Sequence, residues 1–134
     1  MDHKILLVED DADVRLFVFT ALERHGFTTL TAVNGEEGMQ IVRAEMPELI
    51  ILDILLPKQS GVKMYRELKK DDTLLHIPVV VLSGISRRTF LRSQEALTES
   101  EGRNVPEPEA YLEKPVTAAE LIETVRRFLP KDAG

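Results

Sequence analysis

The chain has 134 residues, of which 43% are hydrophobic and 30% charged, a composition typical of a single globular domain. Its net charge of −6 argues against broad binding to nucleic acid, and the lack of cysteine excludes disulfides, thiolate metal sites and a catalytic thiol. No apolar run is long enough to span a membrane and the N-terminus lacks a signal peptide pattern, so we expect a cytoplasmic protein without direct membrane or nucleic acid partners.

Short β-like runs alternate with helical patterns along the chain. Four of the five runs are mostly apolar, as in parallel strands covered on both faces, whereas the Thr-rich second run predicts an edge strand. Strands are expected at 4–8, 28–32, 49–53, 77–82 and 109–112. Helices are expected at 12–25, from the cap at Asn34 to about Met46, at 60–70, and after the capping box of Thr117 and Glu120. Five β–α units in series predict an α/β fold with a doubly wound parallel sheet.

The segment 84–108 is open to two interpretations. Its apolar residues Phe90, Leu91 and Leu97 form only a thin helical stripe, and Gly102, Pro106 and Pro108 interrupt regular structure after it. One interpretation is a poorly packed, exposed helix followed by a turn. The other is a specialised mobile surface element.

Polar residues follow four of the five predicted strands. In a sheet of order 2-1-3-4-5 the first and third strands are neighbours, so Glu9 and Asp10 would converge with Asp53, and Ser83 and Lys114 would flank them. Converging carboxylates are tolerable around a hard divalent cation such as Mg²⁺. Asp53 is also a plausible nucleophile, because carboxylates form acyl-phosphate intermediates.

Four motifs carry a resemblance to a known family: "LLVEDD", "LDILLPKQSG", "VVVLSG" and "YLEKP". In this order and at these strand ends they resemble the receiver domain of bacterial two-component response regulators, over roughly residues 4–129. The resemblance implies a flavodoxin-like (βα)5 fold with strand order 2-1-3-4-5. It also implies one receiver domain over 1–134, with no effector domain in this chain.

The resemblance implies a role for each acidic residue and for the lysine. Asp53 would accept a phosphoryl group from a phosphohistidine on a sensor histidine kinase or a histidine phosphotransfer protein. Asp10 would bind Mg²⁺ (or Mn²⁺) directly, Glu9 largely through water, and Leu55 through its backbone carbonyl. Lys114 would bridge Asp53 and the phosphoryl group.

The remaining roles implied by the resemblance concern the switch. Ser83 would donate a hydrogen bond to a phosphoryl oxygen, Tyr111 would turn inward when this hydroxyl moves, and the Lys114–Pro115 peptide bond would be cis. These movements would alter the surface of the fourth helix, fifth strand and fifth helix. A downstream effector, or a second copy in a phosphorylation-dependent homodimer, would bind there.

The chain departs from the family pattern in the spacing between Ser83 and Lys114. These residues are 31 positions apart, which exceeds the family norm by about two helical turns' worth of chain.

Two alternative functions remain. A pseudo-receiver would use the fold as an interaction module without phosphorylation, against which the intact set Asp10, Asp53, Ser83 and Lys114 argues. A Mg²⁺-dependent aspartyl-phosphate phosphatase would need a second aspartate at position 55, which is Leu55. We therefore expect slow autodephosphorylation and no turnover enzyme.

Overall fold

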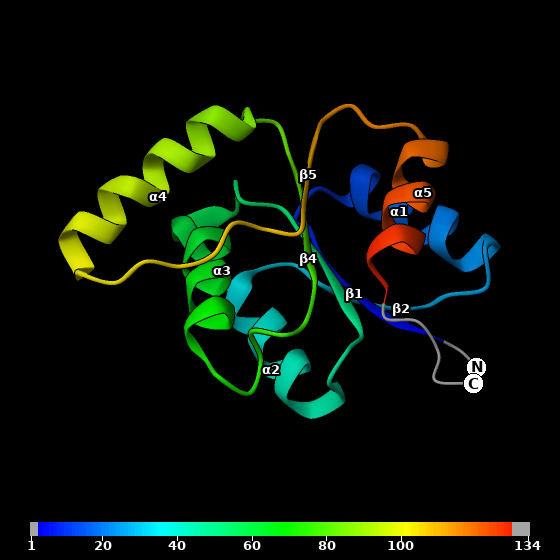
Figure 1. Cartoon of the computed structure of the whole chain (residues 1–134). Coiled ribbons are helices and arrows are strands. Elements are labelled where there is room, and N and C mark those ends of the chain that lie inside the picture. The colour runs from blue at the N-terminus through cyan, green and yellow to red at the C-terminus, as the bar shows by residue number, and fades with distance from the viewer. Residues whose placement is uncertain (1–2, 130–134) are drawn as a thin grey trace.

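The computed structural model describes residues 3–129; residues 1–2 and 130–134, at the two ends of the domain expected over 1–134, lie outside the described residues. Five parallel strands form one sheet in the order β2-β1-β3-β4-β5. Helices α1 and α5 cover one face, and α2, α3 and α4 lie on the other (Figure 1). The elements are β1 (Lys4–Val8), α1 (Ala12–Arg24), β2 (Thr28–Ala32), α2 (Gly35–Glu45), β3 (Leu49–Leu52), the 3-10 turn η1 (Pro57–Gln59), α3 (Ser60–Lys70), β4 (Val79–Ser83), α4 (Arg87–Glu101), β5 (Ala110–Glu113) and α5 (Ala118–Phe128). This is the expected flavodoxin-like fold.

The three central strands are buried on both faces. β3 and β4 have no exposed residue, and β1 is buried from Ile5 onward. The Thr-rich strand β2 is half-exposed at one edge, as predicted, and β5 forms the other edge. Because both faces of the central strands are covered, their apolar residues run without alternation, as expected for parallel strands.

The sheet divides the apolar interior into two cores. Alternate residues of β1 point to opposite sides, with Ile5 and Leu7 in one core and Leu6 and Val8 in the other. The core under α1 and α5 also contains Val18, Leu22, Leu121 and Val125. The core under α2, α3 and α4 also contains Val42, Met64, Leu68 and Phe90.

Side-chain caps set where the helices begin. Asp11, Asn34, Ser86 and Thr117 each accept a hydrogen bond from a backbone N–H in the first turn of their helix. The predicted caps at Asn34 and Thr117 are therefore confirmed. β4 begins two residues later than predicted, because Pro78 has no N–H and the N–H of Ile77 closes a turn on the Leu74 carbonyl at 3.0 Å.

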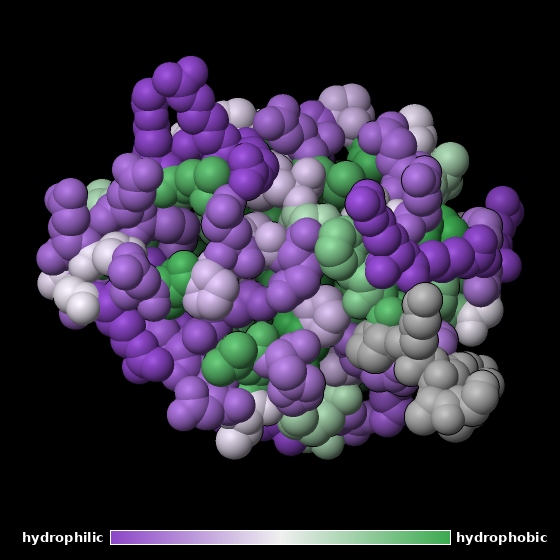
Figure 2. Space-filling view, in the orientation of Figure 1, coloured by the Kyte–Doolittle hydropathy of each residue, from purple (hydrophilic) through white to green (hydrophobic). Residues whose placement is uncertain are grey.

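The segment 84–108 contains the longest helix, α4, followed by an extended return to β5. Only Phe90 and Gln94 of this helix are buried. Helix α4 projects from the body of the domain, and the return segment 102–109 passes over α3 (Figure 1). On the face that α4, β5 and α5 share, separate apolar patches lie among mostly hydrophilic side chains (Figure 2). The predicted helix and the irregular chain after it are confirmed, and the interpretation as a mobile surface element stays a prediction.

Candidate functional site

Three carboxylates meet at the carboxyl edge of the sheet. β1 and β3 are paired with Val8 opposite Leu52, so the next residues, Glu9 and Asp53, emerge at the same level. The backbone N–H of Asp53 donates to the Val8 carbonyl at 3.0 Å, which extends this pairing by one residue. One carboxylate oxygen each from Glu9, Asp10 and Asp53 lies within 4.8 Å of the others. Because β1 and β3 are neighbours in the sheet, Asp53 lies beside Glu9 and Asp10, which follow β1 much earlier in the chain.

Lys114 supplies the positive charge of the site. Its Nζ lies 2.7 Å from Glu9 Oε1 and donates a hydrogen bond to Asp53 Oδ2 at 3.2 Å. Its backbone N–H donates to the Ser83 carbonyl at 2.8 Å, which fixes it at the end of the β4–β5 pairing. The Lys114–Pro115 peptide bond is cis, as the sequence resemblance implied.

Burial and charge perturb the two most closely coupled groups. Glu9 is 1% exposed, and this burial raises its pKa even though the Lys114 ammonium acts in the opposite direction. Burial disfavours the charged form of Lys114, but the two neighbouring carboxylates outweigh it and raise the pKa of the lysine. Lys114 is therefore an ammonium in the folded protein. One ammonium facing three carboxyl groups leaves the site short of positive charge.

The residues expected to form the switch lie beside the carboxylates. Ser83 is fully buried at the end of β4, and its Oγ makes no well-aligned hydrogen bond among residues 3–129, although the Tyr111 hydroxyl lies near it. The Tyr111 hydroxyl instead donates to the Ile85 carbonyl at 2.7 Å, and its ring packs against Phe90 at 5.6 Å. Burial raises the pKa of Tyr111 to about 12. A buried hydroxyl without a partner is a donor available to a group that enters the site.

The backbone around Asp53 is held by contacts that sequence reasoning did not predict. The N–H of Leu55 donates to Asp53 Oδ1 at 2.9 Å, while the predicted metal-binding role of its carbonyl stays a prediction. At Gly61, the second residue of α3, a Cβ would lie 2.4 Å from the Asp53 carbonyl oxygen. The glycine thus permits a close approach of α3 to the segment that carries Asp53.

The loop after β1 is fixed by two further side chains. Asp11 caps α1 through hydrogen bonds from the N–H groups of Asp13 and Val14, and these bonds lower its pKa. Arg15 Nη1 donates to the Glu9 carbonyl at 3.0 Å, a role that no local sequence signal indicates. Asp10 is exposed at the mouth of the site, where a solvated cation can reach it.

The oxygen donors fit the ion that the acidic cluster suggests. Mg²⁺ favours octahedral coordination by oxygen, usually from one or two carboxylates together with water and a phosphoryl group. Glu9, Asp10 and Asp53 provide such carboxylates, and no nitrogen or sulfur ligand that would favour Zn²⁺ belongs to this cluster.

Comparison with known proteins identifies the family. A family model described as the response regulator receiver domain matches residues 5–126. The chain belongs to this family. The receiver domain is 32% identical over 130 residues to the polar-differentiation response regulator DivK of Brucella anthropi, a match that covers 96% of this chain and 98% of that protein. It is 31% identical over 130 residues to the DivK of Brucella ovis, with the same coverage.

Solved structures resemble the receiver domain over nearly its whole length. The signal receiver domain of a histidine kinase from Syntrophus aciditrophicus is 28% identical, with a TM-score of 0.80 and coverage of 98% of this chain and 96% of the other. A putative response regulator from Chloroflexus aurantiacus has the same TM-score at 24% identity, covers 98% and 100%, and supports the fold alone. Across residues 3–129, no helix combines the length and apolar character needed to cross a bilayer.

Proposed function

We propose that Asp53 accepts a phosphoryl group from a phosphohistidine in a Mg²⁺-dependent reaction. Receiver domains are signalling modules that interact with histidine kinases and effectors in two-component systems. The observation that carries the proposal for this chain is the meeting of Asp53, Glu9 and Asp10 within 4.8 Å, with Lys114 in contact with two of them.

In the proposed step an Asp53 carboxylate oxygen forms a bond to phosphorus. The phosphorus–nitrogen bond to the donor histidine breaks, and the imidazole nitrogen retains the electron pair and is available for protonation. Lys114 lies where its ammonium can stabilise the charge of the transferred group, and the unpartnered Ser83 hydroxyl can donate to a phosphoryl oxygen. The ammonium of Lys114 is already in contact with Asp53 before transfer.

The metal would be held by Glu9, Asp10, Asp53 and the Leu55 carbonyl. When bound, Mg²⁺ supplies positive charge that offsets the phosphoryl oxygens and the carboxylates. Because Glu9 and Asp53 are 1% and 4% exposed, this charge would act in a largely desolvated site, where electrostatic interactions are strong.

The donor would dock beside α1, whose N-terminus lies next to the carboxylates. Leu16 is 64% exposed and Phe17 44% exposed, both large apolar side chains at the surface of this helix. They line a groove of about 400 Å³ that reaches Ala118 on α5. An exposed apolar helix face that follows the loop carrying Glu9 and Asp10 suits the helical surface of a kinase or phosphotransfer protein.

The proposal is tested by incubation with acetyl phosphate and Mg²⁺ followed by intact-protein mass spectrometry. One phosphoryl group, labile to hydroxylamine, should add to the wild type and to Asp72→Asn, a control change at an exposed carboxylate outside the site. Neither Asp53→Asn nor chelated wild type should be labelled. Equal labelling of Asp53→Asn would show that the acceptor is wrongly assigned, and an unlabelled, folded wild type would support a pseudo-receiver.

A further inference from the structure

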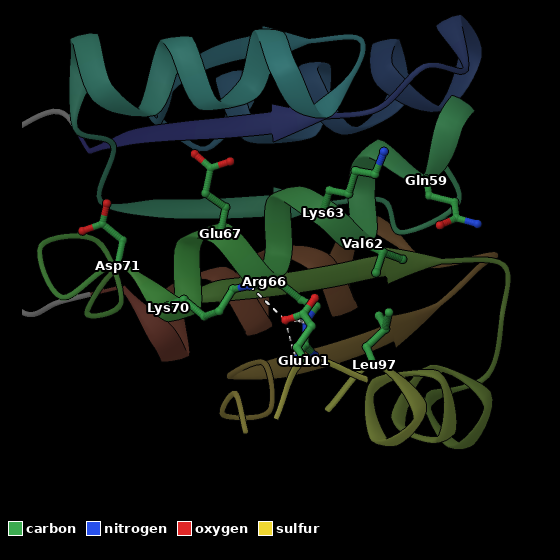
Figure 3. Close-up of a pocket in the computed structure, with 9 residues that line it drawn as sticks. All are labelled: Gln59, Val62, Lys63, Arg66, Glu67, Lys70, Asp71, Leu97 and Glu101. Carbon is green, nitrogen blue, oxygen red and sulfur yellow. Dashed lines mark hydrogen bonds and ion pairs between the residues drawn. The ribbon is translucent and has the colours of Figure 1, made fainter. Parts of the chain in front are cut away.

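Arg66 of α3 is a buried arginine outside the phosphoacceptor site. It is 3% exposed and donates hydrogen bonds from Nε and Nη2 to Glu101 Oε2 at 3.2 and 3.1 Å. Its Nη1 donates to Gln94 Oε1 at 2.7 Å, and Nη2 also donates to the Arg103 carbonyl at 3.1 Å. One guanidinium thus joins α3 to the middle of α4, to its last residue and to the return segment. Figure 3 shows its contact with Glu101, the last residue of α4.

Three neighbours of Arg66 on α3 make contacts of the same kind. Lys70 Nζ donates to Glu101 at 3.0 Å, and the buried Lys69 donates to Glu109 at 2.9 Å. The Tyr65 hydroxyl donates to the carbonyl of Pro106. We call Tyr65, Arg66, Lys69 and Lys70 with these partners the α3 clasp.

Apolar packing contributes little to the seating of the outer half of α4. The face of α4 that turns toward α3 reads Phe90, Gln94, Leu97 and Glu101, of which only Phe90 is a fully buried apolar residue. Beyond it a groove of about 680 Å³ separates the helices, with Val62 on one side and Leu97 on the other (Figure 3). The position of this half of the helix therefore depends on directional hydrogen bonds to Arg66.

The same helix connects the clasp to the switch residues. The Phe90 ring packs edge-on against Tyr65, with 5.4 Å between ring centroids, and at a tilt against Tyr111, with 5.6 Å between centroids. Tyr111 in turn holds the Ile85 carbonyl just before α4 begins. A shift of α4 therefore changes the surroundings of Tyr111, and a shift of Tyr111 changes those of α4.

We infer that Arg66 is a positioning residue, which holds α4 and residues 102–109 in the arrangement described here and thereby opposes conversion of the phosphoacceptor site to its occupied state. The second half of this inference rests on the proposed function. A contact that stabilises one arrangement reduces the affinity of any ligand that favours another. Loosening the clasp should therefore make the site easier to occupy.

The test compares Arg66→Met with Arg43→Met. Arg43 also pairs with two carboxylates, Glu67 and Asp71, but joins α2 to α3 on the exposed surface and does not touch α4. Hydrogen exchange is measured on the unmodified proteins, and binding of beryllofluoride with Mg²⁺, a phosphoryl mimic, is measured by calorimetry. Glu101→Gln, a change at the rim of the clasp, serves as a second variant if Arg66→Met does not fold.

Arg66→Met should exchange amides in 94–109 about tenfold faster than wild type, with the strands unchanged. Its half-saturating beryllofluoride concentration should fall about fivefold, with Arg66→Lys intermediate because it keeps the charge and loses the fork. Arg66→Met that matches Arg43→Met in exchange, or binds beryllofluoride no more tightly than wild type, would overturn the inference. A wild type that neither binds beryllofluoride nor is phosphorylated would refute the proposed function instead, and the exchange comparison alone would then decide whether Arg66 positions α4.

Discussion

Replacing Gly61 with alanine would insert a methyl group between α3 and the segment that carries Asp53. The new Cβ would lie 2.4 Å from the Asp53 carbonyl oxygen and 2.7 Å from that of Ile54, so the backbone has to move by at least about 0.6 Å to restore a 3.0 Å contact. Overpacking against backbone costs about 3 kcal/mol. The higher helix propensity of alanine offsets about 1 kcal/mol of this. We expect a net loss of about 2 kcal/mol in the free energy of unfolding.

The assay is thermal and urea unfolding of Gly61→Ala beside Gly84→Ala. At Gly84, which also flanks the site, a Cβ would meet only Leu55 Cδ1, at 4.0 Å, so its stability should stay within about 0.5 kcal/mol of wild type. Gly61→Ala should lower Tm by roughly 5–10 °C and slow phosphorylation by acetyl phosphate, because the displaced backbone carries Asp53. Equal stability of the two variants would refute the close-approach reasoning.

Three further predictions concern the metal site, the ion pair of Lys69 and Glu109, and the ionisation of Tyr111. Mg²⁺ at ten times its dissociation constant should stabilise the wild type by about 1.4 kcal/mol, seen as a rise in Tm that chelation reverses and Asp10→Asn lacks. Glu109→Ala should lower the free energy of unfolding by about 3 kcal/mol, more than Lys69→Met does. It leaves the ammonium of Lys69, which is 4% exposed, without its carboxylate, and it removes the acceptor of the Val79 N–H. Equal losses in the two variants would contradict this. Burial raises the pKa of Tyr111 to about 12. The contribution of Tyr111 to folding stability is therefore fully present below its ordinary pKa of 10.0 and is lost as pH rises toward 12. Tyrosinate absorbance that showed half-ionisation of Tyr111 near pH 10 would contradict this.

The sequence predicted the sheet and the carboxylate cluster well because both depend on local patterns. Apolar runs bounded by Gly, Pro and acidic residues mark parallel strands, and the residues just after parallel strands all lie at one edge of the sheet. The proximity of Glu9, Asp10 and Asp53 could therefore be predicted from the sequence. In the structure Lys114 is in contact with Glu9 and Asp53. The boundary of β4 was less accurate, because the turn that precedes it depends on a hydrogen bond from Ile77.

The seating of α4 could not be predicted from its own residues. Its thin apolar stripe indicated poor packing, and the partner that secures it is Arg66, 28 residues before Gln94. A charged residue on a helix is normally solvated, so nothing in "YRELKK" signals that Arg66 and Lys69 are buried. Their partners become evident only when the return segment is placed over α3.

The two apolar cores separate disturbances on one side of the domain from those on the other. Within residues 3–129 the core beneath α1 and α5 has no residue in common with the core beneath α2, α3 and α4. The apolar residues beneath α4 therefore lie on the opposite side of the sheet from those that pack beneath α1, the helix that carries Leu16 and Phe17. The side chains that seat the proposed donor surface can therefore be replaced without repacking those that seat α4.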